Sequence, residues 1–327
     1  MPLHLSREQT PSAPVFDCAA VRVYFIHVPP LCQGNFSPGR CQLTKGSPSP
    51  ILDFKRQGGT DVTKKELLDR CARNGEERIL LGRVLDKLEL AQQRGVPAHT
   101  PFLSPGEQAC VSDLLAAWGR PRHLFWGGYP DGERQICAFL PDWQEPEDVL
   151  SDPEGPLSAL EAKFPPSASL THRDILGSLM GLGITREKLG DILFPSPGLC
   201  QVVALTEAMP ILLSQWEGTG RWKVSLSPIP LSQLSPKPAQ VKTIRDTVAT
   251  PRLDAVIAAG FSTSRSKAAA LISAGKVALN HRECLKGDKL VEEGDVLTCR
   301  GLGKCVVREV PGQSRKGRTM LVLERYL

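Results

Sequence analysis

The chain has 327 residues, a length that allows two or three domains, each with its own core. Its composition is 41% apolar and 23% charged, as in globular proteins, while 29 glycines and 28 prolines exceed average usage and predict loops or linkers. No stretch reaches the roughly 18 uninterrupted apolar residues of a membrane-spanning helix. The sequence therefore predicts no membrane insertion.

The net charge of +5 is concentrated at one end of the chain. Residues 251–327 hold 14 Lys and Arg against 8 Asp and Glu, a net charge of +6, whereas residues 1–250 have a net charge of −1. A positive excess confined to one terminal module favours a nucleic acid or an anionic surface as partner. On charge alone, the alternative is a solvated basic face that has no partner.

The first 50 residues contain eight prolines and only two acidic residues, with no sustained periodicity. This composition predicts an unstructured extension or a transit peptide. Residues 51–100 predict a helical N-terminal unit. Within it, Thr63 is placed to cap a helix with Glu66 as its capping-box partner, and a second helix keeps a period near 3.6 until Gly95 ends it.

Residues 101–230 alternate between helix and strand signals. The run Ser104-Pro105-Gly106-Glu107 predicts a helix start, a hairpin follows over residues 123–140, and an acidic, proline-rich loop covers residues 141–156. Further elements are predicted as follows: a helix from about residue 171, strands at 191–194 and 199–205, a helix at 207–216, and a strand at 221–226. Such an order predicts a two-layer α+β domain, followed by a linker at residues 231–249.

The last module, residues 250–327, predicts two helices on a small twisted sheet. The helices cover residues 252–259 and 264–274, and Gly260 and Gly275 stop them. Four short strands are predicted at residues 276–280, 297–300, 304–308 and 319–323. Arg265 and Lys267 lie on the first turn of the second helix, where backbone amides, the Ser264 hydroxyl and two cations can converge on one phosphate.

Further residues can extend this basic patch along a ribose-phosphate backbone, without reading base edges. They are Arg252, Lys276, Asn280 and Arg282. The alternative is that Arg252 only pairs with Asp254 on the surface while Arg265 is solvated. Gly303-Lys304 resembles the end of a phosphate loop, but the preceding residues do not fit, so this segment predicts a hairpin turn.

The ten cysteines are scattered, and no pair has the short spacing of a structural zinc site. A chain of this length has no need of disulfides, so we expect reduced thiols in an intracellular protein. His281 and Cys284 have no second pair nearby, and no Ser or Cys lies in a nucleophile-elbow context. We therefore expect no metal, no cofactor and no catalytic residue.

Two segments resemble known families. Residues 250–310 resemble an S4 domain, the small RNA-binding module of ribosomal protein S4, tyrosyl-tRNA synthetases and many pseudouridine synthases. The run LGSLMGLGITREKLGDIL at residues 176–193, preceded by His172-Arg173-Asp174, resembles the hallmark of the YlmH family, called photosystem II S4 domain proteins in phototrophs. This resemblance spans about residues 52–327.

The resemblance implies an α+β protein with a helical N-terminal unit, an RRM-like middle domain and a C-terminal S4 RNA-binding domain. Family members are non-enzymatic factors of ribosome-associated quality control that contact ribosomal RNA and tRNA on the large ribosomal subunit. A monomer in the bacterial or cyanobacterial cytoplasm, or alternatively in the plastid stroma, is implied. The implied RNA contacts are Arg252, Ser264, Arg265, Lys267, Lys276, Asn280, Arg282, Arg300 and Lys304.

Several alternatives stay open at this point. Arg186 and Lys188 could form a second RNA contact or cap the turn between a helix and a strand. The middle domain lacks the paired aromatic stacking motifs of typical RRMs, and Phe125 and Trp126 are more typical of a core. An RNA-modifying enzyme of the pseudouridine synthase kind, and an assembly factor for ribosomes or photosystem II, remain alternative functions.

Overall fold

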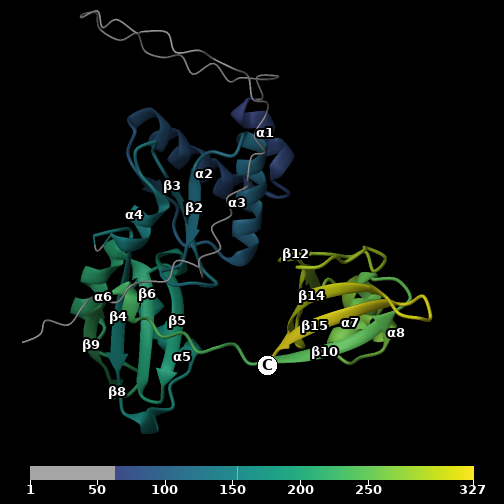
Figure 1. Cartoon of the computed structure of the whole chain (residues 1–327). Helices are drawn as coiled ribbons and strands as arrows, with labels where there is room; N and C mark the ends of the chain where they lie inside the picture. Colours follow the sequence, from purple (N-terminus) through teal and green to yellow (C-terminus); the bar gives the residue numbers. More distant parts are fainter. Residues whose placement is uncertain (1–62, 153) are drawn as a thin grey trace, which may run out of the picture. The chain divides into compact units, whose positions relative to one another are not determined.

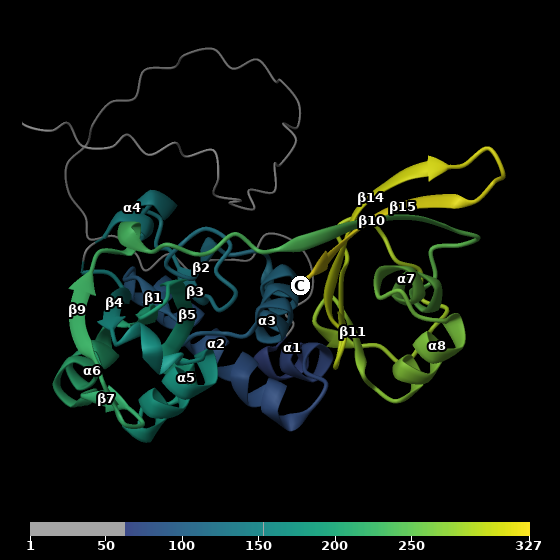
Figure 2. The same cartoon turned by 90° about the horizontal axis from the view of Figure 1, so that it is seen from below.

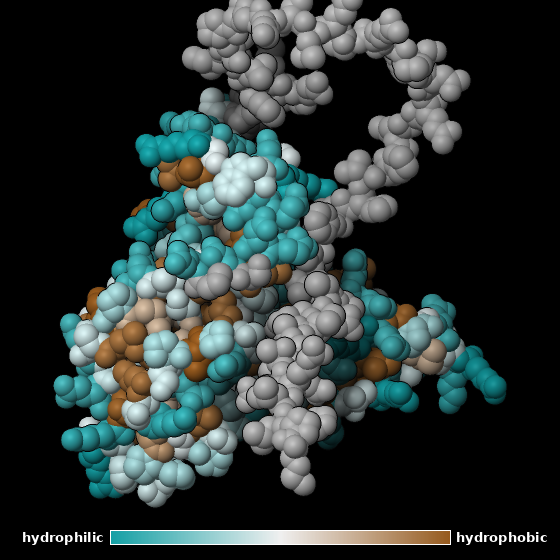
Figure 3. Space-filling model, turned by 60° about the vertical axis from the view of Figure 1, so that its left-hand side comes forward, coloured by the Kyte–Doolittle hydropathy of each residue, from teal (hydrophilic) through white to brown (hydrophobic). Residues whose placement is uncertain are grey.

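The computed structural model describes residues 63–152 and 154–327 (Figure 1). The extension predicted for residues 1–50 and the start of the helical unit at residue 51 lie outside them. In the described part of the chain, no helix is long and apolar enough to cross a membrane. On the face that Figure 3 presents, hydrophobic residues are scattered among hydrophilic ones, as is normal for a protein surface.

Three helices form the first layer: α1 (Lys64–Cys71), α2 (Gly75–Arg94) and α3 (Pro105–Trp118). Asn74 caps α2 by accepting a hydrogen bond from the Glu77 amide, and Gly95 ends that helix in the left-handed conformation with φ 62°. At α3, Ser104 and Glu107 form the reciprocal capping box. The predicted helix start at Ser104 and stop at Gly95 are therefore confirmed.

A small antiparallel sheet packs with these helices in the order β1 (Ala98–His99), β3 (Ile136–Phe139) and β2 (His123–Trp126). The hairpin of β2 and β3 agrees with the prediction. The domain boundary expected at residue 100 separates β1 from β2 and β3, yet β1 pairs with β3 in this sheet. The boundary therefore cuts through one sheet. The first unit thus extends through the hairpin and includes a sheet. A short helix, α4 (Pro146–Ser151), lies in the acidic loop that follows.

The middle domain contains a four-stranded antiparallel sheet in the order β5-β6-β4-β9. Its strands are β4 (Leu157–Lys163), β5 (Leu189–Ser196), β6 (Leu199–Leu205) and β9 (Ser225–Ile229). Helices α5 (His172–Gly181) and α6 (Met209–Gln215) cover one face, where their apolar side chains pack on Leu160 and Val202. A short hairpin, β7 (Gly218–Thr219) and β8 (Trp222–Lys223), follows α6.

The opposite face of this sheet is buried as well. Val203 and Leu205, which alternate with Val202 along β6, pack in one cluster with Phe102, Trp126 and other residues of the first unit. At Gly190 in β5, a Cβ atom would lie 2.8 Å from the Phe102 ring, so only glycine permits this close approach. Trp126 is a core residue, as expected, and neither face of the sheet is open.

Strand β4 was not predicted, and its sequence explains why. Leu-Ser-Ala-Leu-Glu-Ala-Lys is composed of residues that favour helices. The segment nevertheless forms a central strand, pairing with β6 on one side and β9 on the other. Leu157 and Ala159 belong to one core, whereas Leu160 and Ala162 belong to the core on the opposite face, so tertiary packing overrides local propensity here.

The C-terminal domain places two helices, α7 (Leu253–Gly260) and α8 (Arg265–Ser273), on a six-stranded antiparallel sheet. Figure 2 shows these two helices side by side, and Val256, Ile257 and Ile272 fill the core beneath them. The sheet order is β10 (Val241–Val248), β15 (Thr319–Tyr326), β14 (Gly303–Gln313), β13 (Val296–Cys299), β11 (Val277–Leu279) and β12 (Arg282–Glu283).

The linker expected at residues 231–249 is wrong in its second half. Residues 241–248 form β10, which pairs with β15 along its whole length, from Val241 opposite Tyr326 to Val248 opposite Thr319. The strand is an edge strand with mostly exposed side chains, and only Val248 and the half-buried Ile244 reach the core. Its weak apolar pattern explains why the sequence alone did not reveal it.

Candidate nucleic-acid interface

The start of α8 is an exposed, positively charged helix end. Ser264 caps it, accepting a hydrogen bond from the Lys267 amide at 3.2 Å, and lies 3.1 Å from the Ser266 hydroxyl. No acidic residue lies in the first turn of α8 itself, so the helix does not neutralise the positive end of its own dipole. Arg265 and Lys267 add two exposed cations to it. This arrangement favours an anion.

Asp254 of α7 organises the arginines beside this helix end. Its carboxylate accepts a hydrogen bond from Arg265 Nη2 at 2.7 Å and a longer one from Arg252 Nε at 3.4 Å. Burial raises the pKa of Asp254, but the hydrogen bond and charge of Arg265, together with the charge of Arg252, outweigh it, so the pKa lies below its usual 3.8. The carboxylate is therefore ionised at neutral pH.

The two arginines keep open surface although they share this carboxylate. The Arg265 side chain is 61% exposed and that of Arg252 is 43% exposed, whereas that of Asp254 is only 12% exposed. The structure thus brings four of the predicted residues to one place, namely Arg252, Ser264, Arg265 and Lys267. Arg252 does pair with Asp254, as the alternative proposed, but Arg265 joins the same pair and is not simply solvated.

Lys276 and Arg300 lie together at the ends of neighbouring strands. The Arg300 amide donates to the Lys276 carbonyl at 2.8 Å, and both side chains are exposed. Asn280 has a structural task, because its amide group donates to Asp295 at 2.8 Å and its side-chain oxygen accepts from the Val296 amide at 2.9 Å. This clamp holds Asn280 in a left-handed turn with φ 51°. A contact between Asn280 and RNA stays a prediction.

Two other predicted residues have internal partners. The guanidinium of Arg282 donates to the Asp113 carboxylate and to the Ala109 carbonyl, both on α3. The Lys304 ammonium lies 4.8 Å from the centre of the Tyr326 ring, in a cation–π contact. A hairpin turn does form, but at residues 300–302, and the predicted turn residues Gly303 and Lys304 already belong to strand β14.

Arg186 is directed to its own turn. Its Nη1 donates to the Leu189 carbonyl at 2.7 Å and to the Gly190 carbonyl at 3.0 Å. Burial, with a smaller contribution from the neighbouring Arg134, lowers the pKa of Arg186. Lys188 lies 3.0 Å from the Glu207 carboxylate. These contacts favour the capping role for Arg186 over the role in RNA contact.

A further basic segment was not singled out in the sequence. Arg315 and Lys316 are exposed at the tip of the β14–β15 hairpin, and Arg318 beside them donates to Thr247 of β10. Figure 2 shows this hairpin reaching beyond the rest of its sheet. The run Arg-Lys-Gly-Arg is visible in the sequence as a basic turn, which is the signal that could have identified it.

Reactive cysteines and metal sites gain no support in residues 63–152 and 154–327. No three His, Cys, Asp or Glu side chains gather there in a way that could hold a metal. The seven described cysteines are free thiols. Burial raises the pKa of Cys200 to about 12 and is the main reason for a pKa of about 11 at Cys305, so both stay protonated at neutral pH.

Matches to family models agree with this architecture. Three family models match in chain order: "YlmH, N-terminal" over residues 76–141, "Putative RNA-binding domain in YlmH" over residues 157–233, and the S4 domain over residues 251–297. The last match defines the C-terminal unit as an S4 domain, and it includes the start of α8. A solved structure, "Cell division protein ylmH from Streptococcus pneumoniae", is 22% identical, covers 50% of this chain and 96% of its own, and has a TM-score of 0.43.

A curated relative defines the family. "Ribosome-associated protein quality control protein P2" of Bacillus subtilis (strain 168) is 32% identical over 251 residues, which are 76% of this chain and 95% of the relative. This chain therefore belongs to the YlmH family.

Proposed function

We propose that this protein binds structured RNA through its S4 domain and acts on the large ribosomal subunit in ribosome-associated quality control. One observation carries the proposal: Arg252 and Arg265 share the ionised Asp254 carboxylate beside the capped start of α8, whose first turn also carries Lys267. The name of the Bacillus subtilis relative supports the ribosomal context. Ribosomal RNA and the tRNA held by the subunit are the proposed partners.

The arrangement suits a phosphate better than a base edge. Asp254 holds two guanidinium groups in place before any ligand arrives, which lowers the entropy lost on binding. Three cations against one carboxylate leave a local excess of positive charge at a helix end whose amides favour anions. Lys276, Arg300 and the basic tip at Arg315 and Lys316 would extend contact along the RNA backbone.

A binding role without catalysis fits Asp254. An RNA-modifying enzyme of the pseudouridine synthase kind needs a catalytic Asp that reaches its substrate. Asp254, the aspartate of the Arg-Leu-Asp segment, has a side chain that is only 12% exposed and is occupied by two arginines. This supports a positioning role for Asp254 and a non-enzymatic protein. The proposal also takes the protein to be a monomer in the bacterial cytoplasm or, alternatively, in the plastid stroma.

Sedimentation with ribosomal subunits tests the proposal. The purified full-length chain is mixed with bacterial large or small subunits and pelleted through a sucrose cushion. We expect it to pellet with large subunits, and we expect Arg265→Ala with Lys267→Ala to weaken that binding by about tenfold or more. The control, Lys242→Ala with Arg245→Ala on exposed β10, removes the same charge elsewhere in the domain and should have a much smaller effect.

Two results would contradict this function. One is equal pelleting with both subunits, and the other is an equal loss in the two double variants. Crosslinking of the bound complex, followed by mapping of the attached RNA, then identifies the RNA segment that faces α8.

A further inference from the structure

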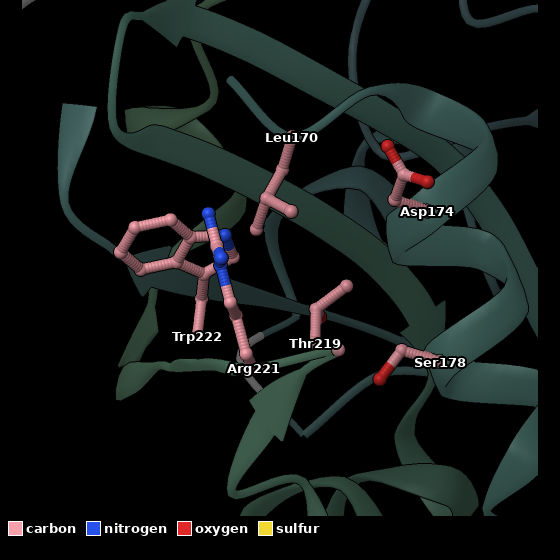
Figure 4. A pocket seen from close by; sticks show the side chains of 7 residues that line it. Leu170, Asp174, Ser178, Thr219, Arg221 and Trp222 are labelled. Atoms are coloured by element: carbon pink, nitrogen blue, oxygen red, sulfur yellow. The ribbon is translucent and has the colours of Figure 1, made fainter. Parts of the chain in front are cut away.

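A pocket of about 320 Å³ lies in the middle domain between α5 and the β7–β8 hairpin (Figure 4). Arg221 and Trp222 of the hairpin form one wall, and Asp174 and Ser178 of α5 form the other, while Leu170 and Thr219 lie between them. The site shares no residue with the basic cluster at α8.

One wall of the pocket is flat and aromatic. The guanidinium carbon of Arg221 lies 4.8 Å from the centre of the Trp222 ring. Arg221 is exposed and Trp222 is half-buried, so both the guanidinium and the indole ring contribute surface at the rim of the pocket. Arginine planes and indole rings are the surfaces on which unpaired bases stack in proteins that bind single-stranded RNA.

The other wall accepts hydrogen bonds. Oδ2 of Asp174 takes the Thr171 amide at 2.9 Å and the Thr171 hydroxyl at 2.6 Å, while Oδ1 has no hydrogen-bond partner among the described residues. The hydrogen bonds from Thr171 lower the pKa of Asp174, so it is ionised at neutral pH. The Ser178 hydroxyl donates to the Gly218 carbonyl at 2.8 Å, so its oxygen can accept but has no proton left to donate.

These walls disfavour a phosphate and favour the edge of a base. A carboxylate repels a phosphate, but it accepts N–H groups from a nucleobase. Guanine carries adjacent N–H donors on N1 and N2, whereas uracil has a single N–H between two carbonyls. A purine also offers a larger face for stacking on Arg221 and Trp222.

The fold also excludes the usual alternative in such domains. RRM-like domains stack bases on the open face of their sheet. Here that face is covered, because Val203 and Leu205 of the sheet pack against Phe102 and Trp126. A base that binds the middle domain needs another surface, and the pocket beside α5 has both a stacking wall and acceptors. Arg173 and Lys223 are exposed next to the residues that line it, and they can contact the flanking phosphates.

We propose that this pocket binds one unpaired nucleobase of an RNA strand, with guanine preferred, by stacking on Arg221 and Trp222 and by donating N–H groups to Asp174. This inference rests on the proposed function, because it requires that the protein binds RNA. It adds a base-reading site to a protein whose S4 domain contacts only the backbone.

The test measures binding of fluorescent RNA decamers to the full-length chain. One probe consists of ten uridines, and in the other the two central uridines are replaced by two adjacent guanosines. We expect the second probe to bind about tenfold more tightly. Trp222→Ala and Arg221→Ala should bring the two affinities to within about twofold of each other. Trp143→Ala is the matched control, since Trp143 is 67% exposed and lies outside the pocket, and it should keep the preference.

Asp174→Asn is the second variant, because an asparagine oxygen can still accept from Thr171 and keep the helix capped. It should lose the guanine preference while the uridine probe binds as before. Equal binding of both probes to the unaltered chain, or a preference that persists in Trp222→Ala and Asp174→Asn, would overturn the proposal. Arg265→Ala with Lys267→Ala should weaken both probes equally, so failure of the pocket and failure of the S4 interface give different results.

Discussion

Two arginine clusters in this protein look alike in composition and differ in use. Where the loop between β2 and β3 meets strand β5, Arg134 and Arg186 lie near Asp191, and in the S4 domain, Arg252 and Arg265 lie at Asp254. Arg134 and Arg186 donate to backbone carbonyls, among them the Leu189 carbonyl that both share. The arginines at Asp254 instead share one carboxylate and keep much of their surface in water. The nature of the acceptor therefore separates a structural arginine from one that is ready for a ligand.

Asp191, beside Arg134 and Arg186, has a structural role. It accepts hydrogen bonds from the Tyr129 hydroxyl at 2.7 Å, the Glu133 amide at 2.6 Å and the Arg134 amide at 3.2 Å. Burial, helped by the hydrogen bond to Asp191, raises the pKa of Tyr129 well above its usual value. These hydrogen bonds attach the loop after β2 to strand β5. Substitutions at this cluster should therefore lower the stability of the protein and leave its RNA affinity unchanged.

The largest expected effect is at Arg134. Its Nη2 donates to the Phe102 carbonyl at 3.0 Å and its Nε to the Leu189 carbonyl at 3.1 Å. Arg134→Met removes the side-chain donor to the Phe102 carbonyl and leaves the Leu189 carbonyl with only the donor from Arg186, so the free energy of unfolding should fall by about 3 kcal/mol in urea denaturation. RNA affinity of the folded variant should be unchanged. A loss of stability under about 0.5 kcal/mol would remove the distinction between the two clusters.

Arg186→Ala should come next, with a loss of about 1.5 kcal/mol, because the Gly190 carbonyl loses its side-chain donor and the Leu189 carbonyl keeps only the donor from Arg134. The neighbouring Lys188→Ala, which breaks only an exposed pair with Glu207, should cost less than about 0.5 kcal/mol. Neither change should alter RNA binding. A clear drop in RNA affinity for Arg186→Ala, measured on folded protein, would instead support the second RNA contact.

At Arg265 we expect the opposite result, a small change in stability and a large change in RNA affinity. Because its side chain is 61% exposed, Arg265→Ala should change the free energy of unfolding by less than about 1 kcal/mol. Binding to purified large-subunit RNA should nevertheless weaken by about tenfold, since a charge-assisted phosphate contact is lost. A filter-binding titration beside a urea titration gives both numbers. Lost stability with unchanged affinity would place Arg265 with the structural arginines.

The smallest expected effect concerns pH. The pKa of Asp254 is lower in the folded protein than its usual 3.8, so its stabilising contribution is present above about pH 4 and is lost as pH falls through the folded value. The difference in free energy of unfolding between the unaltered chain and Asp254→Asn should therefore shrink as the pH falls from about 5 to about 3, because the carboxylate becomes protonated. A difference that stays constant in thermal unfolding over this range would contradict the assigned ionisation.

Local signals in the sequence predicted the ends of elements well and the roles of charges poorly. Ser104, Gly95 and Ser264 cap the helices that are adjacent to them in the sequence, so these helix ends could be predicted without knowledge of the fold. Strands β4 and β10 needed their partners, because one has helical composition and the other lies exposed at a sheet edge. The roles of Arg186 and Asn280 depended on acceptors and donors that only the folded chain brings close.

The salt dependence of RNA binding tests the S4 interface most directly. Affinity for large-subunit RNA is measured from low to moderate salt for the unaltered chain and for the triple variant Arg252→Ala, Arg265→Ala, Lys267→Ala. If these side chains contact phosphates, the slope of log affinity against log salt should become shallower by about two to three units. An unchanged slope, with both proteins folded, would contradict the account.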